Sequence, residues 1–94
     1  MVMKTYIIIY NLYSPGQDYE TIKSVIESLF SKSIHLTRST FAVRSYRSAI
    51  EIRNLLEPFV DHNDMLLVIE VDPNNWATLN YPKDASGWIK QQGL

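Results

Sequence analysis

Two stretches of the chain are almost uninterrupted runs of large apolar residues, and the segments between them show helical or alternating spacing. The first run is Tyr6 to Tyr10, and the second is Met65 to Val71, broken only by Glu70. β-Branched and aromatic residues dominate both runs, which favours β-strands. Because neither run alternates apolar with polar residues, both faces of each strand are predicted to be covered.

Two other segments place their apolar residues on one side of a helix. The first helix is predicted over about residues 19–31, with Asp18 as its N-cap. The second begins at a capping box formed by Ser48 and Glu51 and ends near Val60. The apolar positions are Ile22, Val25, Ile26, Leu29 and Phe30 in the first, and Ala49, Ile52, Leu55, Leu56 and Phe59 in the second.

Between the helices, Ile34 to Arg44 is rich in strand formers and contains neither glycine nor proline. We interpret it as one long or bulged ribbon, which a ferredoxin-like topology would divide at a point that the sequence does not mark. After the turn residues 72–75, Trp76 to Tyr81 is predicted to form a short edge strand. Pro82 then fits the first turn of a short C-terminal helix that contains Gly87.

The order strand, helix, ribbon, helix, strand predicts an α+β sandwich with two helices on one face of the sheet, in a single domain over residues 1–94 of which 74–94 form a C-terminal extension. Two helices cover one face of the sheet, so the other face needs a further layer. A second copy packed sheet to sheet would provide this layer most simply. The alternative is that the tail folds back over that face through Trp76 and Trp88. For the homodimer, the predicted interface residues are Tyr6, Ile8, Tyr10, Leu67, Ile69 and Trp76.

Composition excludes several classes of protein. The 94 residues are 46% hydrophobic, which rules out a disordered chain, and the net charge of −1 gives no overall attraction to nucleic acid or anionic lipid. The chain has no cysteine, which excludes disulfides, thiolate metal ligands and a cysteine nucleophile. Neither a signal sequence nor an apolar run of about 20 residues is visible, so we expect a cytoplasmic protein with no membrane partner.

Several segments together resemble a known family. The strand YIIIYNL with its PGQDY continuation, the ribbon HLTRSTFAV, the helix SAIEIRNLL and the strand NDMLLVIEV are similar to CRISPR-associated protein 2, the small subunit of the spacer-acquisition complex in microbial defence. They are more similar still to its stand-alone SinR-like relatives. The resemblance extends from Lys4 to about Lys90. It implies a ferredoxin-like fold, a sheet-to-sheet homodimer and, as reported for some members, metal-dependent nuclease activity.

The resemblance also implies a catalytic aspartate at the end of the first strand, and here that position matches Asn11. Mg²⁺ and Mn²⁺ bind mainly through carboxylates, so a neutral amide predicts an impaired metal site and a degenerate nuclease. No cofactor is expected, and Mg²⁺ or Mn²⁺ would matter only if nuclease activity persists. Alternatively, the Asn11 side chain forms a hydrogen bond with the backbone of the turn that follows it. Asp18 is the nearest replacement carboxylate, although its competing role is the helix cap.

Two histidines are the candidates for acid–base catalysis near neutral pH, His35 in the ribbon and His62 after the second helix. Neither has the spacing of a Ser-His-Asp arrangement. His35 equally fits a hydrogen-bonded strand residue, and protonated His62 would interact favourably with the carbonyl end of the helix.

One local basic cluster stands out, consisting of Arg38, Arg44, Arg47 and Arg53. Doubled by a two-fold axis, these arginines could follow a phosphate backbone. The alternative is a solvated ribbon and helix start, with Arg53 paired to Glu57 one helical turn later.

The sequence therefore predicts a homodimeric binding or assembly module that contacts double-stranded nucleic acid or a protein partner. Catalysis is not the expected role. Two alternatives stay open: a metal-dependent endonuclease or an RNase toxin similar to virulence-associated protein D, and a protein-binding adaptor or regulator of a defence complex.

Overall fold

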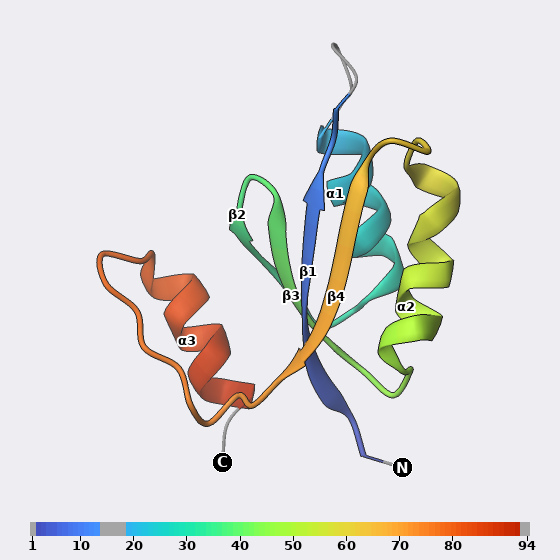
Figure 1. The fold of residues 1–94 in the computed structure, drawn as a ribbon. Helices are drawn as coiled ribbons and strands as arrows, with labels where there is room; N and C mark the ends of the chain where they lie inside the picture. Colours follow the sequence, from blue (N-terminus) through green and yellow to red (C-terminus); the bar gives the residue numbers. More distant parts are fainter. Residues whose placement is uncertain (1, 14–18, 93–94) are drawn as a thin grey trace.

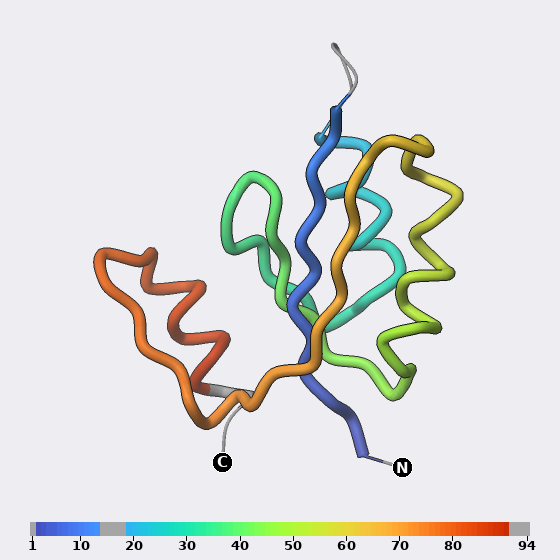
Figure 2. Tube along the Cα trace, in the orientation of Figure 1, coloured from blue at the N-terminus to red at the C-terminus, as the bar shows by residue number. Residues whose placement is uncertain are grey.

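The computed structural model describes residues 2–13 and 19–92, which form four β-strands and three α-helices (Figures 1 and 2). In chain order the elements are β1 (Lys4–Asn11), α1 (Tyr19–Leu29), β2 (Ser33–Thr37), β3 (Thr40–Ser45), α2 (Ala49–Leu56), the 3₁₀ turn η1 (Glu57–Phe59), β4 (Met65–Val71) and α3 (Lys83–Gln92). The strands form one antiparallel sheet in the order β2-β3-β1-β4. This α+β arrangement is compatible with a ferredoxin-like fold.

β1 is a central strand of the sheet, because it pairs with β3 on one side and with β4 on the other. Alternate side chains of a strand point to opposite faces. Ile8, opposite Phe41 and Val68, therefore faces one way, and Ile7, opposite Ala42 and Ile69, faces the other. We call the side that packs against α1 and α2 the helix face, and the opposite side the outer face (Figure 1).

The core lies between the helix face and helices α1 and α2. Its side chains are each at most 4% exposed, and burying each large apolar one stabilises the fold by about 1.5–3 kcal/mol. The members are Tyr6, Ile8, Tyr10, Ile22, Ile26, Phe30, Phe41, Val43, Ile52 and Leu56. The helical spacing predicted from the sequence thus directs both amphipathic helices onto one face of the sheet.

The predicted capping box at the start of α2 is confirmed. The Ser48 hydroxyl accepts the backbone N–H of Glu51 at 3.2 Å, and the Glu51 carboxylate accepts the backbone N–H of Ser48 at 2.9 Å. This bond from the Ser48 N–H is the main cause that lowers the pKa of the Glu51 carboxyl. Two amide hydrogens that the helix itself leaves unpaired are thereby satisfied.

The interpretation of Ile34 to Arg44 as one ribbon is wrong, because the chain turns at Arg38 and Ser39 and forms the separate strands β2 and β3. The turn is held from a distant part of the sequence. Tyr10 donates its backbone N–H to the carbonyl of Ser39 at 3.0 Å and its hydroxyl to the carbonyl of Arg38 at 3.2 Å. A register shift between His35 and Thr37 adds an irregularity to the pairing.

The C-terminal segment lies on the outer side of the sheet, beside β2 and away from α1 and α2 (Figure 1). Ala85 and Ile89 of α3 are 3% and 5% exposed, and the Tyr81 hydroxyl donates to the carbonyl of Leu36 at 2.6 Å. The predicted edge strand from Trp76 to Tyr81 is wrong, since this stretch contains no strand. The predicted C-terminal helix is confirmed as α3.

Candidate functional site

An apolar stripe remains exposed on the outer face, along β1 and β4. It consists of Ile9, Met65, Leu67 and Ile69, whose side chains are 39%, 55%, 52% and 48% exposed. In the register of the sheet Ile9 lies opposite Leu67, which places the two on the same face. The stripe exists because α3 lies beside β2 and leaves the β1–β4 side of the outer face uncovered (Figure 1).

The structure corrects half of the predicted dimer interface. Tyr6, Ile8 and Tyr10 are at most 2% exposed because they point into the core of their own chain, so they are not available to a partner. In β1 the outer face is formed by the other alternate set, which includes Ile7 and Ile9. Leu67 and Ile69 do lie on the outer face and are half exposed, while their role in an interface stays a prediction.

Trp76 borders this outer face near the end of β4. It lines a shallow hollow of about 460 Å³ together with Ile7, Val71, Asp72, Asn75 and Ala77. Its side chain is half-buried, and within the described part of the chain its buried indole N–H meets no hydrogen-bond acceptor. The tryptophan therefore offers a partner the exposed part of its apolar ring, while the indole N–H is turned away from solvent.

Asn11 lies at the opposite end of the stripe, where it is exposed and pairs with Met65. Beside it, the Asp64 carboxylate accepts two backbone N–H groups, from Tyr13 at 2.9 Å and from Asp61 at 2.8 Å. Through these two hydrogen bonds, the carboxylate connects the segment after β1 to the loop before β4. Asp18 lies outside the described residues. Among residues 2–13 and 19–92, no group of three or more histidine or acidic side chains is placed to hold a metal ion.

An aromatic cluster lies where β1 ends. The Tyr10 and Tyr19 rings are 5.9 Å apart, the Arg38 guanidinium stands 4.4 Å above the Tyr19 ring, and the Tyr19 hydroxyl accepts the backbone N–H of Leu12 at 3.2 Å. Burial, with the neighbouring Tyr19 as a smaller cause, raises the pKa of Tyr10 to about 12. Tyr10 thus stays neutral and serves as a core residue and hydrogen-bond donor.

The two candidate histidines lie in different surroundings. His35 stacks on Phe41 with ring centroids 4.6 Å apart and an interplanar angle of 23°, so its ring fills space at the edge of the sheet. His62 is exposed in the loop between η1 and β4. The structure thus gives His35 a packing role and places His62 at a solvent-exposed surface.

Arg38, Arg44 and Arg53 do not form one patch, and Arg47 lies in the loop between β3 and α2. Arg38 lies in the β2–β3 turn and Arg44 near the far end of β3, roughly 20 Å away at the rise of an extended strand. Arg44 donates to the carbonyl of Met3 at 2.6 Å. Arg53 lies on α2, over the helix face, and donates to the side-chain oxygen of Asn54 at 2.9 Å. Closeness in sequence was therefore a poor guide to closeness in space.

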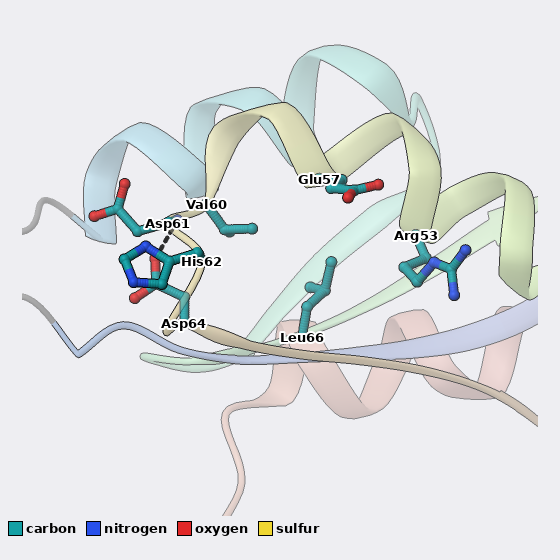
Figure 3. A pocket seen from close by; sticks show the side chains of 7 residues that line it. All are labelled: Arg53, Glu57, Val60, Asp61, His62, Asp64 and Leu66. Atoms are coloured by element: carbon teal, nitrogen blue, oxygen red, sulfur yellow. Dashed lines mark hydrogen bonds between the residues drawn. The ribbon is translucent and has the colours of Figure 1, made fainter.

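A second open region lies between α2 and β4, and it was not predicted from the sequence. This hollow of about 650 Å³ is lined by Arg53, Glu57, Val60, Asp61, His62, Asp64 and Leu66 (Figure 3). In the view of Figure 3, β4 forms the lower side of the hollow, and α2 with η1 forms the upper side. Arg53, Glu57 and Val60 recur at the spacing of one helix side, but only the fold shows that this side flanks the outermost strand.

No protein-family model, curated protein or solved structure matches the chain. In the part of the chain that the structure describes, every helix is too short or too polar to cross a membrane. The apolar stripe is the centre of the candidate site.

Proposed function

We propose that this protein is an assembly module that works as a homodimer, in which two copies bury the apolar stripe against each other. The observation that carries the proposal is the exposure of four large apolar side chains side by side on a sheet whose other face is packed. Contiguous exposed apolar surface of this kind marks interaction sites in soluble proteins.

A second copy fits the stripe because an apolar surface is complementary to itself. A two-fold axis through the stripe would bring the same residues together from both chains, as in most homodimers. A standard interface buries about 800 Å² on each partner, which is more than the stripe alone provides. The stripe would therefore be the centre of the interface, with Trp76 and Asn11 at its rim.

The resemblance to CRISPR-associated protein 2 implies the same sheet-to-sheet homodimer, and Asn11 at the position of the family aspartate predicts an impaired metal site. Of the two predicted ligand classes, the geometry favours a protein over double-stranded nucleic acid. A protein that binds the phosphate backbone of a duplex needs its cationic side chains in one continuous track. Arg38, Arg44 and Arg53 instead occupy separate parts of the surface.

Equilibrium sedimentation tests the homodimer directly. At micromolar concentration we expect twice the chain mass of 10.9 kDa. Leu67→Lys and Ile69→Lys should each shift the protein to monomers, because a charge would be buried in the interface. Ile50→Lys is the matched control, since Ile50 is an exposed isoleucine on α2, on the other side of the sheet. Wild-type protein that sediments at 10.9 kDa would overturn the proposal.

A further inference from the structure

The two edges of the sheet are protected to different degrees. At one edge, β2 has five residues and a register shift, lies beside α3 and receives the Tyr81 hydroxyl on the Leu36 carbonyl. At the other edge, β4 has seven residues with no proline or lysine, and its pairing is regular. Proteins normally protect sheet edges with such devices, because bare edges pair with other strands.

The edge of β4 that points away from β1 has no strand partner within the described residues, where β4 pairs with β1 alone. Its single charged residue, Glu70, lies 3.6 Å from Lys4 of the neighbouring strand. In an edge strand, every second residue directs its N–H and C=O outward. β4 therefore presents a row of backbone donors and acceptors in a regular, mostly apolar strand.

The hollow between α2 and β4 opens along this same edge (Figure 3). Val60 and Leu66 supply apolar surface, and the charged side chains in the lining are Arg53, Glu57, Asp61 and Asp64. With three carboxylates and one guanidinium, the lining has a negative formal charge, and of these carboxylates that of Asp64 already accepts two backbone N–H groups. A basic side chain that enters the hollow would be favoured, and an acidic one would be repelled.

We propose that β4 binds an extended segment of a partner protein by strand addition, and that this segment alternates apolar and basic residues. One alternate set of its side chains would continue the outer face beside Leu67 and Ile69. The other set would point to the helix side, beside Leu66, and place basic groups in the hollow. Backbone hydrogen bonds supply affinity and the alternate side chains supply specificity, as in other strand-addition complexes.

A second β4 does not suit this place. The residues of β4 on the helix side are Leu66, Val68 and Glu70, so a second copy would bring an acidic group and no basic one to the hollow. The segment that pairs with this edge is therefore not a second β4. The proposal goes beyond the homodimer, because the bound segment pairs with the free edge of β4, whereas the dimer buries the existing outer face of β1 and β4.

A short synthetic peptide tests this binding mode. The probe is a seven-residue peptide of alternating valine and lysine with neutral ends, titrated into the isotopically labelled full chain at low salt. We expect the backbone amide signals of β4 to shift and their hydrogen exchange to slow on binding. The same peptide with glutamate in place of lysine should bind at least tenfold more weakly, because of the acidic hollow.

Two further comparisons separate strand pairing from loose charge attraction. Methylation of the peptide amides in one alternate set should abolish binding, and methylation of the other set should have little effect, because only one set faces β4. In the protein, Glu57→Lys should weaken binding about fivefold. Glu27→Lys on α1 is the matched control, since Glu27 is an exposed glutamate away from the hollow.

No binding of the lysine peptide at roughly millimolar concentration would overturn the proposal. Equal binding of the glutamate peptide, or equal effects of the two methylation patterns, would also overturn it. The homodimer is measured separately by sedimentation of the protein alone. A protein that dimerises and ignores the peptide therefore refutes strand addition only, and a monomer that binds the peptide refutes the homodimer only.

Discussion

On the outer face, the β2–β3 side and the β1–β4 side are both built from strands with apolar residues. On the β2–β3 side, Ala42 is fully buried and α3 packs nearby through Ala85 and Ile89. On the β1–β4 side, Leu67 and Ile69 stay about half exposed. The strands do not determine this difference. It follows from where the C-terminal segment docks, and the amount of outer face left for a partner depends on α3.

The largest expected effect comes from a matched pair of isoleucines on the two sides. Ile89→Ala should lower the free energy of unfolding by about 2–5 kcal/mol, because it leaves a cavity under α3. Ile69→Ala makes the same chemical change at a half-exposed position and should cost about 1 kcal/mol or less in the monomer. Urea unfolding at protein concentrations below those that support a dimer measures both. Equal losses would contradict the difference in cover.

A smaller effect is expected where the tail is hydrogen-bonded to β2. Tyr81→Phe removes the hydroxyl that donates to the Leu36 carbonyl and should cost about 1 kcal/mol. The amide hydrogens of β2 should also exchange faster with solvent. Tyr13→Phe is the control, because the Tyr13 side chain is 61% exposed, and its effect should stay within about 0.5 kcal/mol. If both variants match wild type, the bond does not hold the tail in place.

The smallest effect on stability is expected at Asn11, at the uncovered end of β1. Asn11→Asp should leave the free energy of unfolding nearly unchanged, because the side chain is exposed. It should increase the affinity for Mn²⁺, because a carboxylate is a better ligand for a hard cation than an amide. Thermal unfolding with and without Mn²⁺ measures this change in both proteins.

The same pair of proteins tests the nuclease alternative on single-stranded RNA and duplex DNA. Metal-dependent cleavage by the Asn11→Asp variant alone would support the impaired site that the resemblance implies. Cleavage by wild type that EDTA abolishes would contradict it and would favour the endonuclease alternative.

Local signals in the sequence were sufficient for much of the fold. The capping box at Ser48 and the helical spacing around Ile52 identify α2, because these signals act within one or two turns. The break between β2 and β3 could not be found this way. Arg38 and Ser39 carry no strong turn signal, and their turn is held by Tyr10, far away in the sequence.

The candidate site was only partly predictable for a related reason. Uninterrupted apolar strands predict that both faces are covered, but they do not show which alternate set faces the helices. Ile8 and Ile9 look equivalent in the sequence, although one is fully buried and the other is 39% exposed. The hollow beside β4 combines one side of α2 with an edge strand, so it exists only once both elements are packed.

The strand order also affects how the chain is made. β1 is synthesised first, but its neighbours β3 and β4 are completed only at Ser45 and Val71. At about 5–20 residues per second, the ribosome needs about 3–12 s to pass from the end of β1 to the end of β4. During that time β1, an apolar strand, has an unpaired edge. Throughout this interval the free edge of β1 can pair with strands of other chains, so the strand order lengthens the time in which the nascent chain can associate wrongly.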